Sequence, residues 1–332
     1  MARKLKILVI LTGGTIMMER SDKAGPLEPG SCTPLSELLS LFTPDFDFHY
    51  HSLFNLDSSN MQPEHWQTLA RCIFERLADF DGFLILHGTD TMCYTAAALS
   101  FMLEGIRKPV IITGSQLPLR DPGSDGHNNV INSLLLTRKN PGGVFIVFGS
   151  QVIRGTRAKK VSSFDLQAFT SVNEEPIGVI GLSIRWREGI PGKAGKPKLR
   201  DKLDSRVALL KIHPGFSPEL FDYCIKSGNK GIILESYGVG NVPDNFRSLP
   251  PMIRKATKQG TLIVIVSQCM VGITDLTIYE AGKEALEAGA ISGYDMTPET
   301  ALVKLMWTLG NFPENKVRII METPVRGELT PN

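Results

Sequence analysis

The sequence predicts an α/β protein with two domains, each built on a parallel sheet covered by helices. Short runs rich in Val, Ile, Leu and Phe alternate with stretches that place apolar residues at helical spacing, which is a βα repeat. A stretch poor in apolar residues, 187–206, interrupts this alternation. With 332 residues, the chain is long enough for about two domains, each able to bury a core.

The larger, N-terminal domain is expected to contain a flavodoxin-like parallel sheet. Its first strand is the apolar, β-branched run 7–11, which is typical of a buried parallel strand. Residues 46–51 alternate with period two and predict a half-exposed strand. Residues 63–78 have helical spacing, with Pro63 at the first position. Further strands are expected at 83–86, 110–112 and 144–148, and helices at 91–103 and 128–138.

Beyond 187–206 the alternation resumes and predicts a smaller C-terminal domain with a second parallel sheet. The expected strands are 207–211, 232–234 and 262–266, and the expected helices lie near 218–226, around 246–258, and near 279–287 and 298–309. We place the domains at 1–190 and 207–332, joined by a linker over 191–206.

Composition and charge exclude several classes of protein. A hydrophobic content of 42% with 21% charged residues excludes a disordered chain. A net charge of +2 argues against nucleic acid or an anionic membrane as a partner. No run approaches the roughly 18 apolar residues of a membrane span, and the N-terminus is expected to be a strand rather than a signal peptide. The five cysteines lack metal-site spacing, so we expect a reducing, cytoplasmic compartment.

A glycine-rich turn, Thr-Gly-Gly-Thr at 12–15, directly follows the first predicted strand. Two glycines permit a tight turn and a close approach of the backbone to a ligand. Ligands of open parallel sheets bind at the carboxyl ends of the strands. Thr15 is therefore either a nucleophile, if a base removes its proton, or a residue of a plain βα turn. The turn is not a GxGxxG dinucleotide motif, and the sequence contains neither a Walker A nor a GxSxG motif.

The motif His-Gly-Thr-Asp-Thr-Met at 87–92 follows the strand expected at 83–86. Thr89 and Asp90 either line the same crevice as Thr15, where a carboxylate suits a substrate ammonium group, or Asp90 only caps the next helix. His87 is interpreted as a structural histidine.

Two weaker signals complete the set. The loop Asp-Ser-Ser-Asn-Met at 57–61 is either an ordinary turn and cap or a source of hydroxyl and N–H groups for a carboxylate. Lys159 and Lys160 are either a surface basic run, or Lys160 lies beside Asp90 and helps to deprotonate a threonine, since burial shifts a lysine pKa readily.

Together these motifs resemble those of the asparaginase/glutaminase family, and specifically its bacterial type I, cytoplasmic L-asparaginases. The resemblance runs essentially from end to end. Besides the motifs at 12–16, 57–61 and 87–92 and the segment around Lys160, it includes Thr-Gly-Ser-Gln (113–116), Ser-Asp-Gly (124–126), Ser-Tyr-Gly-Val-Gly-Asn (236–241), Gln-Cys-Met (268–270), Asp-Met-Thr-Pro-Glu (295–299) and Arg-Gly-Glu-Leu-Thr (326–330).

The resemblance implies hydrolysis of L-asparagine to L-aspartate and ammonia, without a metal or organic cofactor. It implies that Thr15 attacks the side-chain amide carbon to give an acyl-enzyme. Lys160 and Asp90 would then bias Thr89, which orients or activates the hydrolytic water. The substrate-binding residues that it implies are Asp57, Ser58, Ser59, Gly88, Thr89 and Asp90. Ser58 would hold the α-carboxylate and Asp90 the α-ammonium group.

The resemblance also implies a homo-oligomer, either a dimer or a dimer of dimers, in which a neighbour's C-terminal domain helps to complete the site. Residues 236–241 are expected near that site. The segment 17–34, rich in Gly and Pro, is expected to close over substrate, but it lacks the tyrosine that supports the nucleophile in many members. Glu235 stands where some type I relatives have a basic residue linked to a regulatory asparagine.

Two other functions fit parts of the pattern. The amidase-like subunit of a tRNA-dependent amidotransferase shares both threonine motifs, but it normally has an additional N-terminal domain, for which a first motif at residue 12 leaves no room. A catalytically silent amino-acid-binding module need not keep all four of the residues Thr15, Thr89, Asp90 and Lys160. We therefore expect an L-asparaginase. The discrimination between asparagine and glutamine rests on one methylene, which is worth about 1–3 kcal/mol.

Overall fold

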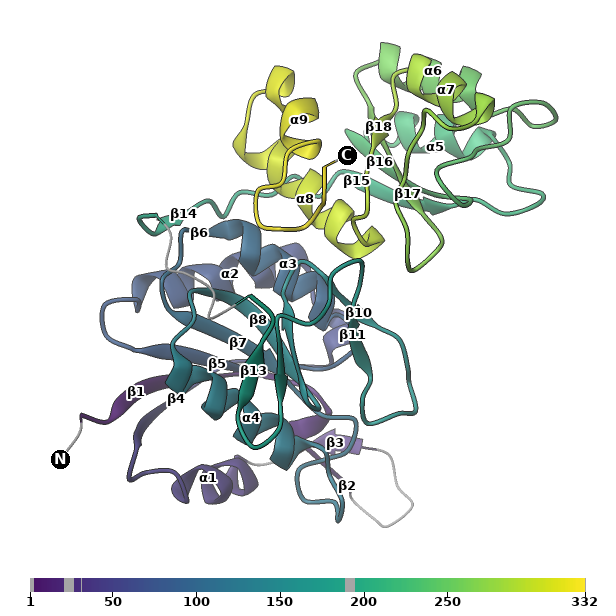
Figure 1. Ribbon diagram of the computed structural model, residues 1–332. Helices are drawn as coiled ribbons and strands as arrows, with labels where there is room; N and C mark the ends of the chain where they lie inside the picture. Colours follow the sequence, from purple (N-terminus) through teal and green to yellow (C-terminus); the bar gives the residue numbers. More distant parts are fainter. Residues whose placement is uncertain (1–2, 21–26, 31, 189–194, 332) are drawn as a thin grey trace. The chain divides into compact units, whose positions relative to one another are not determined.

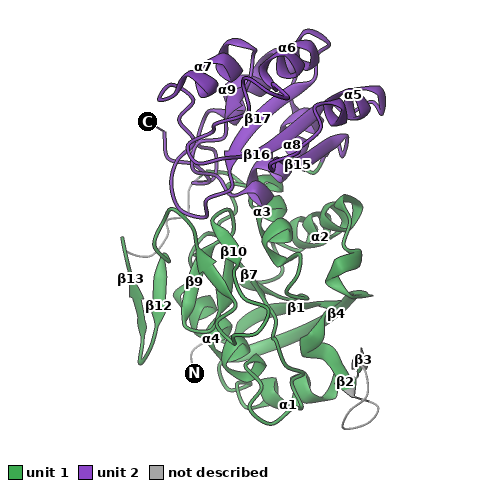
Figure 2. Ribbon diagram, turned by 90° about the vertical axis from the view of Figure 1, so that its right-hand side faces the viewer, with its two compact units in different colours: residues 1–201 green, residues 202–332 purple. Residues whose placement is uncertain are grey.

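The computed structural model describes residues 3–20, 27–30, 32–188 and 195–331. The chain divides into two compact units, Met1–Asp201 and Lys202–Asn332 (Figure 2). Both are α/β, so the predicted fold class is confirmed. Part of the stretch expected as a linker belongs to the first unit, because β14 (Lys198–Leu199) pairs with β6 (Leu103–Glu104).

The first unit is built on an eight-stranded sheet with the order β13-β12-β9-β8-β7-β5-β1-β4 (Figure 1). Its strands are β1 (Leu5–Gly13), β4 (Phe46–Leu56), β5 (Gly82–Leu86), β7 (Pro109–Thr113), β8 (Gly143–Phe148), β9 (Gln151–Arg154), β12 (Gly178–Ile180) and β13 (Ile184–Trp186). The five strands from β4 to β8 are parallel and follow the flavodoxin-like order. The last three are antiparallel, an extension that the sequence does not predict.

Helices cover both faces of this sheet. They are α1 (Thr33–Ser40), α2 (Pro63–Glu75), α3 (Met92–Met102) and α4 (Gly126–Lys139). α2 and α3 lie on one face, and α1 and α4 on the other (Figure 1). Because β1, β5 and β7 are covered on both sides, their continuous apolar runs are buried, whereas the edge strand β4 is half-exposed as predicted.

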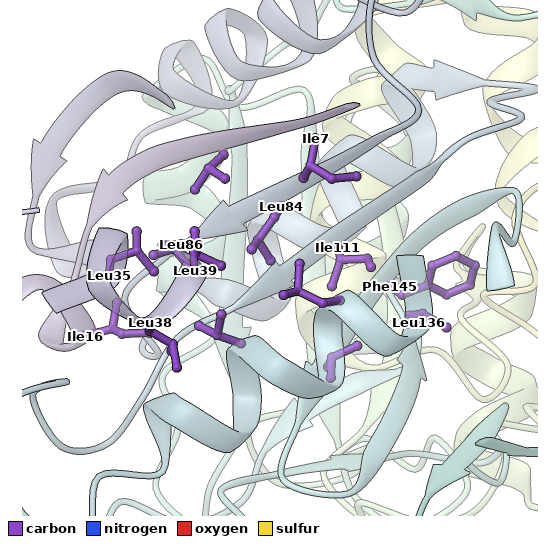
Figure 3. Close-up of a cluster of buried hydrophobic side chains, with 14 of the residues drawn as sticks. Ile7, Ile16, Leu35, Leu38, Leu39, Leu84, Leu86, Ile111, Leu136 and Phe145 are labelled. Atoms are coloured by element: carbon purple, nitrogen blue, oxygen red, sulfur yellow. The ribbon is translucent and has the colours of Figure 1, made fainter. Parts of the chain in front are cut away.

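The core beneath α1 and α4 is contributed by alternate residues of neighbouring strands. Leu84 and Leu86 of β5 pack with Ile111 of β7 and with Leu39 of α1 (Figure 3). Burial of each such side chain contributes about 1.5–3 kcal/mol relative to exposure. This packing fixes the sheet whose carboxyl edge carries the polar loops.

Two hairpin-like pairs project from this unit. β2 (Met18–Arg20) pairs with β3 (Leu27–Pro29), and β10 (Ala158–Lys160) pairs with β11 (Phe169–Ser171). The first pair belongs to the segment expected to close over substrate, of which residues 21–26 and 31 lie outside the described residues. The second pair carries Lys160.

The second unit has a four-stranded parallel sheet whose strands follow one another in chain order. Its elements are β15 (Val207–Lys211), β16 (Gly231–Ser236), β17 (Leu262–Ser267), β18 (Ile291–Ser292), α5 (Glu219–Lys226), α6 (Pro250–Lys258), α7 (Glu280–Glu287), α8 (Pro298–Asn311) and α9 (Glu314–Met321). α5, α6 and α7 pack on one face of the sheet with a shared apolar core. α8 packs on β15, β16 and β17, with α9 beside it.

The helix predicted around 246–258 begins later than expected, at Pro250. Arg247 has φ of 56°, a left-handed conformation that a right-handed helix does not accommodate. Pro250 and Pro251 occupy the first helical positions, where the missing N–H groups cost nothing.

A charged pair lies in the interior of this second unit. Lys304 of α8 and Glu328 of the C-terminal segment have fully buried side chains, and Nζ lies 2.5 Å from Oε1. Lys304 also donates to the carbonyls of Met321 and Thr323, while Glu328 accepts from the Val325 and Arg326 N–H groups. Burial lowers the pKa of Lys304, and Glu328 opposes that shift. The pair ties the C-terminal segment to α8.

Candidate active site

Three polar loops meet at the carboxyl edge of the large sheet. β1 lies between β4 and β5 and is parallel to both. β1, β4 and β5 continue respectively into the turns at 14–17, 57–61 and 87–91. In this sheet β1 is the first strand along the chain and its neighbours are the second and third, so these loops flank the switch point where open α/β sheets bind ligands.

Glycines allow the three loops to touch. A Cβ added to Gly14, which has φ of 90°, would overlap the backbone of Gly88. A Cβ added to Gly88 would lie 2.6 Å from the Ser58 hydroxyl oxygen. The residues next to Thr15 and Thr89 are therefore in direct backbone contact, although the two threonines are 74 positions apart in the sequence.

Lys160 reaches this edge from the β10–β11 pair. Its Nζ donates to the Thr89 hydroxyl at 2.8 Å and to Oδ1 of Asp90 at 2.6 Å. The Lys160 side chain is 22% exposed and that of Asp90 is 61% exposed, so the cation is held between the two groups while the carboxylate stays open to solvent. The surface interpretation of Lys160 is therefore wrong, because the pairing of Lys160 with Phe169 in the hairpin directs this lysine to the site.

The helix-cap interpretation of Asp90 is also wrong. The N-cap residue of α3 is Thr91, whose side chain makes no cap hydrogen bond. Instead the Thr91 hydroxyl donates to the Ser58 carbonyl at 2.7 Å, and the Asp90 N–H donates to the Ser58 hydroxyl at 3.2 Å. These bonds join the loop after β5 to the loop after β4.

The loop after β4 is a turn and cap, which is one of the two interpretations left open by its sequence, and its binding of a carboxylate stays a prediction. The Asp57 carboxylate accepts from the N–H and the hydroxyl of Ser59, both at 2.8 Å, and so caps the short helix 58–60. The Ser59 N–H, with its hydroxyl, holds the pKa of Asp57 below its usual value. Ser58 is buried against the Gly88 turn, whereas Asp57 and Ser59 are exposed.

His87 is a buried structural residue, as interpreted from the sequence. Its Nδ1 donates to the Gly88 carbonyl at 2.6 Å, and its Nε2 accepts from the Thr95 hydroxyl at 2.9 Å. The Thr95 oxygen in turn accepts from the Trp66 indole N–H at 3.0 Å. Burial lowers the pKa of His87 to about 4, so the imidazole is neutral at pH 7.

Gln116 and Asp125 lie near Thr89, within the motifs 113–116 and 124–126. No role for either residue is predicted from the sequence. The Thr89 hydroxyl donates to Oε1 of Gln116 at 3.3 Å. The buried carboxylate of Asp125, before α4, accepts the Gln116 N–H at 3.0 Å and the Leu117 N–H at 3.1 Å. The sequence does contain a signal for Gln116. It is a polar residue just after the buried strand β7, and β7 lies next to β5 in the sheet.

Among the described residues, no group of three or more His, Cys, Asp and Glu side chains is placed to hold a metal ion. Within the same residues, every helix is too short or too polar to cross a bilayer.

Comparison with known proteins adds to this geometry. Residues 6–191 match the family model "Asparaginase, N-terminal", and residues 206–320 match "Glutaminase/Asparaginase C-terminal domain". L-asparaginase 1 of Escherichia coli (strain K12) is 38% identical over 338 residues, which cover 99% of this chain and 99% of that protein. The solved thermostable L-asparaginase from Thermococcus kodakarensis is 37% identical with a TM-score of 0.92, covering 99% of this chain and 100% of that chain.

A second class of relative is also similar along nearly the whole chain. A glutamyl-tRNA(Gln) amidotransferase component of Pyrococcus abyssi is 34% identical over 343 residues, which cover 98% of this chain and 77% of that protein. Both family models, the full-length relatives and the fold lead to one conclusion. This chain belongs to the asparaginase family.

Proposed function

We propose that this protein is an L-asparaginase of the type I branch, which hydrolyses L-asparagine to L-aspartate and ammonia. The observation that carries the proposal is the cluster in which Lys160 donates both to the Thr89 hydroxyl and to Asp90, beside the Gly14–Gly88 contact. Hydrolysis of an unactivated amide needs a nucleophile, a route for protons and donors for the developing oxyanion. The proposed nucleophile is Thr15, the cluster is the proposed route for protons, and N–H groups of the adjoining backbone turns are the proposed donors.

In this proposal Thr15 is the nucleophile. Its Oγ forms a bond to the side-chain amide carbon of asparagine, and the C–N bond then breaks as ammonia leaves with the proton that Thr15 loses. An aspartyl ester of Thr15 remains. Backbone N–H groups of the Gly13–Gly14 and Gly88–Thr89 turns stabilise the oxyanion, and one such donor is worth about 3–4 kcal/mol of barrier. Water then attacks the ester carbon, and its proton returns to Thr15 as L-aspartate is released.

Thr89, Asp90 and Lys160 form the group that handles the water. Lys160 holds the Thr89 hydroxyl, and Thr89 orients the attacking water. The zwitterionic substrate needs one partner for each of its charges, since an unpaired buried charge is costly. The exposed carboxylate of Asp90 binds the α-ammonium group, and Ser58 binds the α-carboxylate, with Asp57, Ser59 and Gly88 shaping the loop around it. This chemistry requires neither a metal nor an organic cofactor.

We further propose a homo-oligomer, a dimer or a dimer of dimers, in the cytoplasm. The loop between β10 and β11 exposes Val161, Phe164 and Leu166, and Phe164 has 91% of its surface open. These apolar side chains lie one to six residues after Lys160, so a neighbouring copy that covers them would also border the site. The five cysteines are free thiols, which supports a reducing compartment.

The decisive experiment is ammonia release from L-asparagine by the purified protein, alongside Thr15→Ala. Loss of the nucleophile should abolish turnover while the circular dichroism spectrum and Tm remain those of the wild type, because Thr15 lies in a short, partly exposed turn rather than in the core. Turnover by Thr15→Ala near the wild-type rate would exclude this mechanism.

The amidotransferase relatives support a second candidate, ammonia production coupled to a tRNA-bound substrate. The same assay separates the two. An L-asparaginase releases ammonia from free asparagine without any partner, whereas a requirement for tRNA or a second chain would favour the amidotransferase reaction.

A further inference from the structure

The hydroxyl of Thr89 is held from two sides. Lys160 Nζ donates to its oxygen at 2.8 Å, and the hydroxyl proton points to Oε1 of Gln116 at 3.3 Å. An ammonium group can only donate, and the carboxamide oxygen can only accept. The two neighbours therefore determine one orientation of the Thr89 O–H bond.

Gln116 is itself held in place. Its Nε2 donates to the Asp165 carbonyl at 3.5 Å, which turns Oε1 towards Thr89. Its backbone N–H donates to both oxygens of Asp125 at 3.0 Å. The Asp125 carboxylate is buried and also accepts from Asn129 Nδ2 at 3.1 Å.

Asn129 links Asp125, which holds the Gln116 backbone, to the carboxyl ends of neighbouring strands. It is fully buried in α4, and its Nδ2 donates to the Gly114 carbonyl at 2.9 Å. Its Oδ1 accepts the Gly149 N–H at 2.7 Å, so the same side chain joins the ends of β7 and β8. The backbone that presents Gln116 is thus fixed from inside the first unit.

We infer that Gln116 is a positioning residue of the reaction, which directs the Thr89 proton away from the hydrolytic water, and that Asp125 holds Gln116 for this purpose. The inference rests on the proposed function, in which Thr89 orients that water. A hydroxyl oxygen has two lone pairs. One accepts from Lys160, and the other remains free to accept a proton of the water. The water that donates to Thr89 has a higher electron density on its oxygen, which attacks the ester carbon.

Without the Gln116 acceptor, the Thr89 hydroxyl can rotate and donate to the water instead. A hydroxyl that donates to the water no longer accepts its proton, and the donated bond withdraws electron density from the attacking oxygen. Breakdown of the acyl-enzyme should then slow, whereas substrate binding should persist, because Ser58 and Asp90 recognise the charged groups of asparagine.

The test uses the full chain with Gln116→Met, Gln116→Glu and the matched control Gln259→Met, which changes an exposed glutamine at the end of α6. Methionine keeps the length of the side chain but removes the acceptor. A lost neutral hydrogen bond corresponds to a loss of about five- to tenfold, so Gln116→Met should lower kcat by that factor. Because slower breakdown of the acyl-enzyme lowers kcat and KM together, kcat/KM should change by less than about twofold. Intact mass spectra of the quenched Gln116→Met enzyme should show an aspartyl adduct that is weaker in the wild type.

Gln116→Glu provides the conservative rescue. Its carboxyl group keeps an acceptor oxygen at the same distance, so kcat should exceed that of Gln116→Met. Because a carboxyl group titrates where a carboxamide does not, the pH profile of kcat should gain an ionisation in the acid range. Gln259→Met should behave as the wild type, and equal Tm values would establish that all variants fold.

Several results would overturn the inference. These are an unchanged kcat in Gln116→Met, a loss of kcat/KM as large as the loss of kcat, no additional adduct, or equal losses in the Met and Glu variants. If the wild type turns over asparagine and any of these holds, the inference fails while the proposed function stands. If the wild type releases no ammonia, both fail together.

Discussion

Each unit of the molecule contains a lysine bonded to a carboxylate, and the two pairs differ in their surroundings. Lys160 and Asp90 lie at the edge of the large sheet, with 22% and 61% of their side chains exposed. Lys304 and Glu328 lie in the core of the second unit, and neither side chain is exposed. The N···O distances, 2.6 Å and 2.5 Å, are almost equal.

The difference lies in what else each pair can bind. Around Lys304 the remaining partners are backbone groups, the carbonyls of Met321 and Thr323, which cannot leave. Around Lys160 the second partner is a hydroxyl, and the Asp90 carboxylate faces solvent. The buried pair Lys304–Glu328, which we call the sealed pair, is suited to holding a chain segment in place. The partly exposed pair Lys160–Asp90, which we call the open pair, can also bind a ligand. The N···O distance alone would not distinguish these two roles.

Among these substitutions, removal of the Lys160 ammonium group should have the largest effect. It should lower activity and leave stability almost unchanged. In Lys160→Met the Thr89 hydroxyl and Asp90 lose their common donor, so kcat for asparagine should fall by about 10²–10⁴-fold, the range for general acid–base groups. The Tm should change little, because the pair is partly solvated and contributes little to stability. Steady-state ammonia release and thermal unfolding measure the two quantities.

The matched control for Lys160→Met is Lys255→Met, the same substitution on the surface of α6. It should leave kcat unchanged. A similar loss of activity in both variants, or a large fall in Tm of Lys160→Met, would contradict the contrast between the open and the sealed pair.

Substitution in the sealed pair should instead lower stability and leave activity unchanged. Glu328→Gln leaves the Lys304 ammonium buried without a counter-charge, which costs about 3–5 kcal/mol of the free energy of unfolding. Urea unfolding of the second unit should therefore shift to lower concentration, while kcat of the molecules that remain folded is retained.

A double variant, Lys304→Met with Glu328→Gln, refines this prediction. It removes the charge but keeps an acceptor for the Val325 and Arg326 N–H groups. Stability should recover in part, since a buried ion pair can often be replaced by neutral groups at little cost. A double variant less stable than Glu328→Gln would show that the lysine contributes through its bonds to the backbone and not through its charge.

His87 is a buried titratable group beside the candidate active site. The pH dependence of unfolding tests whether it contributes to stability, as the buried pair Lys304–Glu328 does. The folded protein binds a proton at His87 only near pH 4, whereas the unfolded chain binds it near pH 6.5. The unfolded state therefore gains protons first as the pH falls, and stability is lost between about pH 6.5 and 4. The total loss amounts to about 3 kcal/mol.

His87→Asn keeps a donor for the Gly88 carbonyl but does not titrate. Urea unfolding at several pH values should give a shallower decline in the free energy of unfolding for His87→Asn than for the wild type. Parallel curves would mean that other groups account for the acid sensitivity.

The sequence predicted those parts of the molecule that follow from local pattern. β1, β5, β7 and β8 are continuous apolar runs, and polar residues at their carboxyl ends meet because parallel strands end at the same edge. α1 has apolar residues at Leu35, Leu38 and Leu39, which is helical spacing, although no helix is predicted there.

The contacts that local pattern alone does not predict depend on long-range pairing. Lys160 reaches Thr89 only because the chain from 158 pairs with the chain from 169, and no periodicity in this polar stretch indicates that pairing. Gln116 requires the neighbouring position of β7 and β5. Lys304 lies within a helix, where a lysine normally indicates an exposed face, and its partner is 24 residues further along the chain. The roles assigned to the site residues stay predictions.

The smallest effect is expected from a third lysine pair, which lies on the surface. Lys255 of α6 donates to Asp222 of α5 at 2.7 Å, with 47% and 28% of the side chains exposed. Its bond is nearly as short as those of the other two pairs, but water competes for both partners. Lys255→Met should therefore lower the free energy of unfolding by less than about 1 kcal/mol, and by still less at high salt. Urea unfolding at low and high ionic strength measures this difference. A loss comparable with that of Glu328→Gln would mean that short N···O distances, rather than burial, determine what such pairs contribute to this fold.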